Sequence, residues 1–268
     1  KIRNRQSKIP FMSKIVFITG ATSGFGKACA EKFASAGYDL ILNGRREDRL
    51  EEIKSSLLNR YNIAICTLPF DVRDKEKVFH AIKNLPADWQ AIDVLINNAG
   101  LALGRDYFDE ADLDDWETMI DTNVKGFLYV TKATLPFLIQ NKKEKGSAHI
   151  INMGSVAGFE VYEKGNVYCA TKFALDALSQ SMRIDLLRHG IKVTNIQPGA
   201  AETEFGIVRF KGDEQTAKKV YEGLQPLTAV DVAEAVFYTT TLPPHVCVNE
   251  LVITCIQQAN TLYFHRNS

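Results

Sequence analysis

Short apolar runs recur along the chain and alternate with longer segments whose apolar residues have helical spacing. The short runs are continuous rather than alternating, which is typical of strands buried on both faces of a parallel sheet. They predict seven strands, at residues 14–18, 39–42, 63–68, 93–96, 148–152, 192–196 and 251–254. Helical spacing occupies residues 27–36, 47–60, 75–84, 113–140 and 167–189.

Strands separated by helices predict βαβ units, whose crossover helices cover both faces of one sheet. The expected fold class is therefore α/β, with a doubly wound, seven-stranded parallel sheet in a three-layer sandwich. No stretch rich in Pro, Gly or Ser divides the chain, so residues 13–268 are expected to form a single domain. Residues 1–12 carry four basic residues and little apolar content, and we expect a flexible basic tail there.

Composition narrows the possible partners. Lys plus Arg and Asp plus Glu balance at 32 each, so no overall basic field favours nucleic-acid binding. The longest apolar runs are too short to cross a membrane. The five cysteines are scattered without a CxxC pair, which indicates no disulfide framework and a reducing, cytoplasmic location. His149, His189 and His245 lack metal-ligand spacing, so no metal site is expected.

A glycine-rich loop follows the first predicted strand. Gly20, Gly24 and Gly26 have the spacing GxxxGxG, and a predicted helix begins at residue 27. Glycines permit the tight turn and let backbone N–H groups approach a pyrophosphate at the positive end of the helix. A purely structural turn is the alternative, but the position after the first strand favours dinucleotide binding. No GK[ST] sequence follows, which disfavours nucleotide hydrolysis.

The end of the second predicted strand bears on which dinucleotide binds. An NAD site usually places an acidic residue about 20 residues beyond the glycine loop, where it binds the ribose 2′-hydroxyl. Here Gly44 is followed by Arg45 and Arg46. Guanidinium groups match a 2′-phosphate in charge and geometry, so we expect NADP rather than NAD. Two solvated charges at a helix start are the alternative interpretation.

Tyr168 and Lys172 are the strongest candidates for proton transfer. Four residues apart on a predicted helix, they project from the same face. A nearby ammonium stabilises a phenolate, so Lys172 is expected to lower the pKa of Tyr168 towards working pH. Ser155 follows the fifth predicted strand, thirteen residues before Tyr168. An ordinary amphipathic helix face is the alternative for the Tyr–Lys pair alone.

Several motifs occur together in the order and spacing of one family. They are Thr19-Gly20-xxx-Gly24-x-Gly26, Asn97-Asn98-Ala99-Gly100, Asn123, Ser155, Tyr168-xxx-Lys172 and Pro198-Gly199. From residue 14 to about residue 203, the chain resembles the short-chain dehydrogenase/reductase family, whose members have a single-domain Rossmann fold. The resemblance implies an NADP-dependent oxidoreductase.

The resemblance also implies a role for each motif residue. Tyr168 would be the general acid or base, and Lys172 would lower its pKa and bind the nicotinamide ribose. Ser155 would hold the substrate oxygen, and Asn123 would support a water relay to Lys172. The implied cofactor-binding residues are Gly20, Ala21, Thr22, Ser23, Gly24, Phe25, Gly26, Arg45, Arg46, Asp71, Val72, Asn98, Tyr168, Lys172, Pro198, Gly199 and Thr203. Many relatives have an extra or apolar residue between the Pro-Gly pair and the Thr, whereas this chain has Ala200-Ala201-Glu202. This departure weakens the basis for a contact between Thr203 and the nicotinamide carboxamide.

Within that family, residues 98–104, 115–123 and 203–212 most resemble the NADP-dependent 3-hydroxy acid dehydrogenases, which also oxidise serine and allo-threonine. The implied small-molecule substrate carries a carboxylate, which a cation should face. The first candidates for this cation are Arg209 and Lys211, and Arg105 is the next. The alternative is that these residues are solvated charges on a lid. Residues 204–221 mix apolar and charged types, as expected of a lid that closes over cofactor and substrate.

Two other functions stay open at this point. One keeps the chemistry but acts on uncharged ketones, aldehydes or diketones. The other is a non-catalytic NADP-binding regulator, against which the complete set of four catalytic candidates argues. The predicted helices 113–140 and 167–189 are apolar on more than one face, which indicates subunit contacts. Relatives pair these helices, so a homotetramer is expected.

Overall fold

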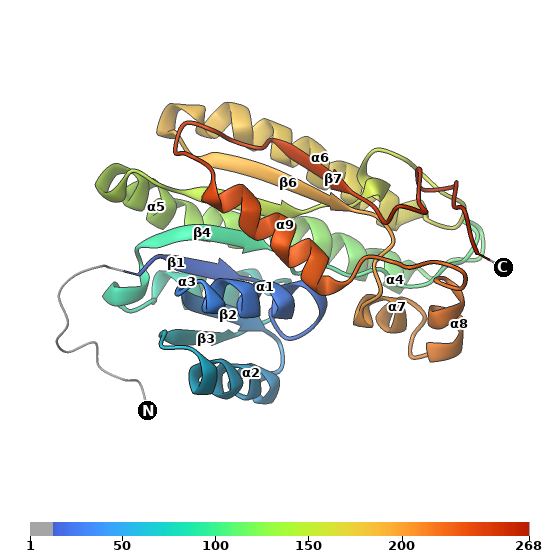
Figure 1. Cartoon of the computed structure of the whole chain (residues 1–268), viewed down its shortest axis with the longest axis horizontal. Helices are drawn as coiled ribbons and strands as arrows, with labels where there is room; N and C mark the ends of the chain where they lie inside the picture. Colours follow the sequence, from blue (N-terminus) through green and yellow to red (C-terminus); the bar gives the residue numbers. More distant parts are fainter. Residues whose placement is uncertain (1–12, 268) are drawn as a thin grey trace.

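A computed structural model describes residues 13–267 of the protein (Figure 1). The tail expected at residues 1–12 lies outside the described residues. Within residues 13–267, seven strands form one sheet in the order β3-β2-β1-β4-β5-β6-β7, and every neighbouring pair is parallel. The strands are β1 (Ile15–Ile18), β2 (Asp39–Gly44), β3 (Ile65–Pro69), β4 (Ile92–Asn97), β5 (His149–Met153), β6 (Lys192–Pro198) and β7 (Glu250–Ile253).

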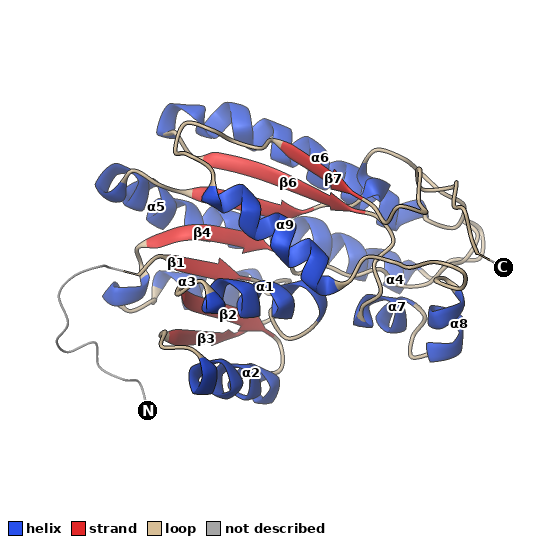
Figure 2. Ribbon diagram, in the orientation of Figure 1, coloured by secondary structure: helices blue, strands red, loops and turns tan. Residues whose placement is uncertain are grey.

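Helices cover both faces of this sheet (Figure 2). They are α1 (Gly24–Ser35), α2 (Glu47–Arg60), α3 (Lys75–Lys83), α4 (Leu113–Ile120), α5 (Phe127–Lys145), α6 (Asn166–Leu186), α7 (Glu204–Arg209), α8 (Glu214–Lys219) and α9 (Ala229–Thr241). Buried residues of α1, α2 and α9 share one apolar cluster, and buried residues of α3, α5 and α6 share another. The predicted fold class, a doubly wound parallel sheet in a Rossmann arrangement, is confirmed.

Strand β1 shows how the continuous apolar runs build this core. Val16 and Ile18 pack into the cluster with α1 and α9, whereas Ile15 and Phe17 pack into the cluster on the opposite face. All four side chains are almost completely buried. A strand covered on both faces needs apolar residues at every position, and for this reason the runs lack alternation. No helix within residues 13–267 has the length and hydrophobicity that a membrane crossing requires.

The prediction of one helix over residues 113–140 was wrong. Helix α4 ends at Ile120, a π-helical segment occupies Asp121–Gly126, and α5 continues to Lys145. The wider turn is held from both sides. The side chain of Asn123 hydrogen-bonds Leu101 and Thr171. A Cβ at Gly126 would lie 2.7 Å from Cγ2 of Val72. Tertiary contacts, rather than local helical preference, therefore determine this turn.

Two other segments differ from the predicted elements. Helix α9 was not predicted, although Thr228 and Asp231 form a capping box at its start, a signal that the sequence carries. Helix α6 ends at Leu186, and a short 3-10 turn, Leu187–His189, completes the predicted segment. The segment expected to be a lid contains α7 and α8.

Candidate active site

The glycine loop lies at the carboxyl end of β1, directly before α1. Gly20 has φ +63°, and a Cβ at Gly26 would lie 2.2 Å from the carbonyl oxygen of Gly20, so both positions require glycine. The side chain of Asn98 donates to the carbonyl oxygens of Thr19 (2.9 Å) and Gly20 (3.1 Å). The Oγ1 of Thr19 accepts in return from the backbone N–H of Asn98 at 3.0 Å. The end of β4 thus braces a cradle that fits a pyrophosphate.

The end of β2 packs against this cradle. A Cβ at Gly44 would lie 2.6 Å from Cγ2 of Thr22, so an acidic side chain at position 44 would collide with the glycine loop. The next two residues, Arg45 and Arg46, are exposed and line the same cleft. A glycine at position 44 followed by two arginines suits a phosphate on the adenosine ribose better than a free hydroxyl.

A cleft of about 1250 Å³ joins this cradle to the ends of β4, β5 and β6 and to the lid helices. The predicted site residues that line it are Gly20, Thr22, Ser23, Gly24, Phe25, Arg45, Arg46, Asp71, Val72, Asn98, Ser155, Tyr168, Lys172, Pro198, Gly199, Thr203 and Arg209. Four predicted residues are absent from its lining: Ala21, Gly26, Asn123 and Lys211. An opening of this kind beyond the carboxyl ends of parallel strands is where such folds bind ligands.

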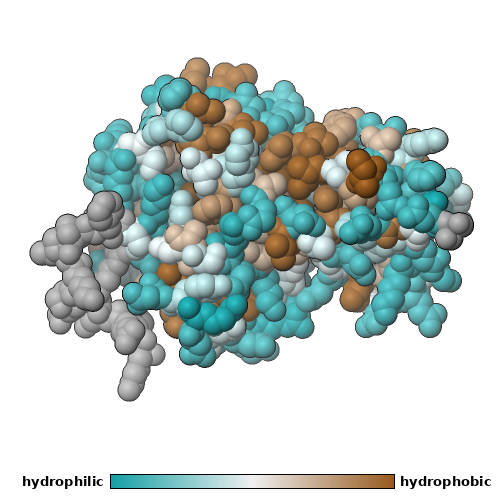
Figure 3. All heavy atoms as spheres, viewed as in Figure 1, coloured by the Kyte–Doolittle hydropathy of each residue, from teal (hydrophilic) through white to brown (hydrophobic). Residues whose placement is uncertain are grey.

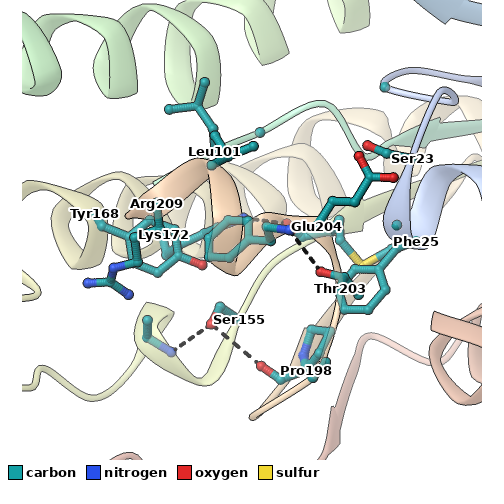
Figure 4. Close-up of a pocket in the computed structure, with 18 of the residues that line it drawn as sticks. Ser23, Phe25, Leu101, Ser155, Tyr168, Lys172, Pro198, Thr203, Glu204 and Arg209 are labelled. Carbon is teal, nitrogen blue, oxygen red and sulfur yellow. Dashed lines mark hydrogen bonds between the residues drawn. The ribbon is translucent and has the colours of Figure 1, made fainter. Parts of the chain in front are cut away.

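Tyr168 and Lys172 lie on the inner face of α6, each only 8% exposed. The Nζ atom of Lys172 is 5.8 Å from the centroid of the Tyr168 ring and donates to the carbonyl oxygen of Met153 at 2.8 Å. The ring of Phe205, on α7, packs against the Tyr168 ring with 5.7 Å between centroids. Figure 4 shows both polar side chains directed into the cleft.

Burial controls the ionisation of this pair. It raises the pKa of Tyr168 well above its usual value, and the hydrogen bond with Ser155 opposes this rise only in part. Burial also lowers the pKa of Lys172 to about 8. The expected lowering of the pKa of Tyr168 is therefore not found. The physical reason is that removal from water disfavours the phenolate more strongly than its neighbours stabilise it.

Ser155 connects the ends of two strands. It precedes a 3-10 turn at Val156–Gly158, and its Oγ accepts from the backbone N–H of Ala157 at 3.1 Å. The same hydroxyl donates to the carbonyl oxygen of Pro198, at the end of β6, at 3.5 Å (Figure 4). Thr203 caps α7 by accepting from the N–H of Phe205 at 3.2 Å. Both hydroxyls thus have fixed positions at the cleft.

Asn123 lies behind the wall of the cleft. Its Oδ1 accepts from the N–H of Leu101 at 2.9 Å, and its Nδ2 donates to the carbonyl oxygen of Leu101 at 2.8 Å and to Oγ1 of Thr171 at 3.0 Å. These bonds tie the π-helical segment to the loop after β4 and to α6. The side chain therefore supports the helix that carries Tyr168, and the water relay stays a prediction.

The structure separates the two candidate substrate cations. Arg209 lies in the cleft with its guanidinium carbon 5.5 Å from the centroid of the Tyr168 ring, and it donates to the hydroxyl of Tyr162 at 2.8 Å. Lys211 instead forms an ion pair with Asp115, with 2.8 Å between Nζ and Oδ2. Arg209 is thus beside the predicted proton donor, while Lys211 is held outside the cleft lining.

Sequence reasoning missed Tyr162 and Gln258, both of which line the cleft. Tyr162 fixes the guanidinium of Arg209. Gln258, on the segment after β7, accepts from the backbone N–H of Ala200 at 2.7 Å. No local spacing marks either residue, because each reaches the site through a loop whose path depends on the whole fold. Together, the fold and cleft define a dinucleotide-binding oxidoreductase.

Comparisons with known proteins agree with this class. The sequence profile of the short chain dehydrogenase family matches residues 14–213, so the chain belongs to that family. It is 48% identical to sulfoacetaldehyde reductase 2 of Chromohalobacter salexigens, over 92% of this chain and 96% of the relative. It is 45% identical to an NADP-dependent 3-hydroxy acid dehydrogenase of Escherichia coli K12, over 91% of this chain and 96% of the relative.

A solved structure is similar over almost the whole chain. It is the closed form of a serine dehydrogenase complexed with NADP⁺, with a TM-score of 0.85 and 45% sequence identity. The match covers 94% of this chain and 100% of the other. The family predicted from the motifs is thereby confirmed.

Proposed function

We propose that the protein is an NADP-dependent oxidoreductase that interconverts the hydroxyl and carbonyl forms of a small anionic substrate, of the 3-hydroxy acid or β-hydroxy amino acid type. The position of Arg209 beside Tyr168 carries this proposal, because it places a cation next to the group that would transfer the proton. The hydroxyl of Tyr162 and the carbonyl oxygen of Gly104, at 2.8 and 3.4 Å, fix the guanidinium. A fixed guanidinium suits the two oxygens of a planar carboxylate.

The relatives support an anionic substrate through shared chemistry. A 3-hydroxy acid has its carboxylate one methylene from the carbon that bears the hydroxyl. Sulfoacetaldehyde has its sulfonate one methylene from the aldehyde carbon. The compounds named for these two relatives, 45% and 48% identical to this chain, thus have an anion at the same separation from the reacting carbon. One cation at a fixed distance from Tyr168 suits either compound.

The proposed mechanism assigns each step to residues of the chain. The nicotinamide, when bound, supplies or accepts the hydride. In carbonyl reduction, the hydroxyl of Tyr168 donates its proton to the substrate oxygen, and in oxidation the phenolate removes that proton. Ser155 holds the same oxygen, and Lys172 binds the ribose beside Tyr168. The cradle at residues 20–25 holds the pyrophosphate, and Arg45 with Arg46 holds the 2′-phosphate.

Replacing Arg209 with alanine is expected to raise KM for anionic substrates by about 10- to 100-fold, because a charge-assisted hydrogen bond contributes about 1.5–3 kcal/mol. Turnover of an uncharged ketone should stay near the wild-type value. Initial rates on a panel of hydroxy acids, β-hydroxy amino acids, sulfoacetaldehyde and ketones, each with NADP and NAD, measure both effects.

The matched control is Lys218→Ala, which removes an exposed cation of α8 that does not line the cleft. It should leave every KM unchanged. Equal losses on ketones and acids in Arg209→Ala would contradict an anion-binding role and favour a reductase of uncharged carbonyls.

The pH dependence should differ between the two directions. Burial raises the pKa of Tyr168, so its hydroxyl is protonated at neutral pH. Reduction requires this protonated form, and oxidation requires the phenolate, whose population grows as pH rises. We therefore expect kcat/KM for reduction to stay constant from neutral to moderately alkaline pH, because the hydroxyl stays protonated, and kcat/KM for oxidation to rise over the same range. Initial rates in both directions across a pH series test this, and parallel trends would contradict it.

We also propose that the protein is a cytoplasmic homotetramer. Apolar residues are exposed along α6 and on the neighbouring edge strand β7, which supports a subunit contact there. Ile184, near the end of α6, and Leu187, in the 3-10 turn that follows, are 75% and 77% exposed. Val252, on β7, is also exposed, and on the face seen in Figure 3 further hydrophobic side chains gather over the region of β7. All five cysteines are free, which fits a reducing compartment.

The mass of the protein in solution should equal four chains, measured by light scattering after size-exclusion chromatography. Ile184→Glu should shift the protein to a smaller assembly, because it places a charge in an apolar contact. Lys143→Glu, on α5, is the control for an added negative charge at an exposed position. A monomeric wild-type protein would contradict the proposal.

A further inference from the structure

The segment at residues 254–267, here called the arm, follows β7 and borders the cleft. Figure 1 shows it in dark red, extending from β7 towards the end of the molecule where α7 and α8 lie. Gln258, Thr261, Phe264 and Arg266 all belong to the cleft lining. The arm therefore brings residues distant in sequence to the loop at residues 198–200 and to the lid.

Gln258 holds the loop at residues 198–200. It is 5% exposed. Its Oε1 accepts from the backbone N–H of Ala200 at 2.7 Å, and its Nε2 donates to the carbonyl oxygen of Asn260 at 3.2 Å. The approach is so close that a Cβ at Gly199 would lie 2.1 Å from that Oε1. Pro198, in the same loop, accepts from the hydroxyl of Ser155.

Gln257, the preceding residue, holds the turn after α8. Its Oε1 accepts from the backbone N–H of Gln225 at 2.7 Å, and its Nε2 donates to the carbonyl oxygen of Gly223 at 2.9 Å. The same Nε2 also donates to the carbonyl oxygen of His265, within the arm, at 3.2 Å. Both amide groups thus use their acceptor and their donor, and removing either side chain leaves backbone groups without their partners.

Arg266 and Asn267 add to the connection with the lid. The guanidinium of Arg266 donates to the carbonyl oxygens of Val220, at 3.1 Å, and Glu222. These carbonyls follow the end of α8, where a cation is electrostatically favoured. The backbone N–H of Asn267 donates to the carbonyl oxygen of Gly223 at 2.9 Å. The turn at residues 220–225 is therefore held by side chains and backbone of the arm.

We propose that Gln258 is a positioning residue for the loop at residues 198–200, and that the arm, through Gln257 and Gln258, couples the position of the lid to that loop. The inference rests on the proposed function and on the expectation from the sequence that Pro198 and Gly199 bind the cofactor. When the turn at residues 220–225 is displaced, Gln257 moves with it. The adjacent Gln258 then moves too, and its hydrogen bond with the N–H of Ala200 weakens. The arm thus links closure of the lid to retention of NADPH.

The proposed coupling predicts an effect on NADPH binding and no effect on proton transfer. Neither glutamine titrates, and neither hydrogen-bonds Tyr168 or Lys172 in the part of the chain that the structure describes. Loss of either should therefore raise the Kd for NADPH and leave the shape of the pH profile unchanged. A residue that only stabilises the fold would lower the amount of active protein without changing the affinity of the remainder.

The test combines NADPH titration with hydrogen exchange. Gln258→Met and Gln257→Met keep a linear side chain but lose the strong acceptor and the donor. NADPH fluorescence should show a Kd raised about 10-fold in Gln258→Met, since an unsatisfied buried N–H costs about 1–3 kcal/mol. The matched control, Gln215→Met on an exposed site of α8, should bind NADPH as the wild type does.

The coupling itself is read from a double-mutant cycle and from the protein without NADPH. The effects of Gln257→Met and Gln258→Met on Kd should not add. Gln257→Met should also speed amide exchange at Ala200, although the side chain of Gln257 hydrogen-bonds only the turn at residues 220–225 and His265 within the arm. Unchanged exchange in β1 and β4 verifies that each variant is folded.

The outcomes separate the two proposals. If the wild type fails to bind NADPH, the proposed function is wrong, while the exchange at Ala200 still decides whether the arm is coupled to the lid. If the wild type binds NADPH and Gln258→Met binds it equally well, the positioning role is wrong. Additive effects in the double mutant, with exchange at Ala200 unchanged in Gln257→Met, would overturn the coupling.

Discussion

Replacing Tyr168 with phenylalanine is expected to lower kcat by about 10³-fold, because a positioned general acid or base contributes about 10²–10⁴-fold to such reactions. The variant loses only a hydroxyl, and its ring keeps the contact with Phe205. NADPH binding should therefore change little. Steady-state kinetics in both directions, together with fluorescence titration of NADPH, measure the two effects separately.

The control for this substitution is Tyr238→Phe, which removes a hydroxyl from an exposed tyrosine of α9. It should have wild-type kinetics. Turnover of Tyr168→Phe at the wild-type rate would show that another group transfers the proton, and the proposed mechanism would then be wrong. A variant that neither turns over nor binds NADPH would instead indicate a damaged site.

Replacing both Arg45 and Arg46 with alanine is expected to weaken NADP binding by about 100-fold or more, while NAD binding changes little. The two side chains are exposed at the end of the cleft, so their removal leaves no cavity. A single charge-assisted hydrogen bond to a phosphate contributes about 1.5–3 kcal/mol. The ratio of kcat/KM with NADP to that with NAD measures the effect directly.

Lys54→Ala is the control, since it removes a cation from α2, the helix that follows the two arginines, where Lys54 pairs with Glu51. It should leave the coenzyme preference unchanged. If the double arginine variant loses NAD and NADP equally, the two cations act on the shared part of the coenzyme rather than on the 2′-phosphate.

The sequence predicted well wherever function and structure depend on neighbours along the chain. The strand runs located the sheet because burial on both faces demands apolar residues at every position. The glycine loop and the Tyr168–Lys172 pair were predictable because a tight turn and a helix face are set by local spacing. The roles assigned to these residues remain predictions that the experiments above address.

Features that depend on distant contacts could not be predicted in this way. Gln258 reaches Ala200 across 58 positions of sequence. Tyr162 acquires its place beside Arg209 only when the lid packs on the cleft. The ionisation of Tyr168 is a similar case, because the sequence shows the ammonium one turn away but not the depth at which both groups are buried.

The π-helical segment Asp121–Gly126 has a consequence for how the protein can evolve. A π turn contains one residue more than an α turn, so deleting a single residue there would restore regular hydrogen bonding. Because the wider turn absorbs the extra residue, the deletion would close the turn and shift the residues within it. Asn123 would then leave its bonds with Leu101 and Thr171. A mutation that makes this helix more regular would thus detach the support of α6, the helix that carries Tyr168.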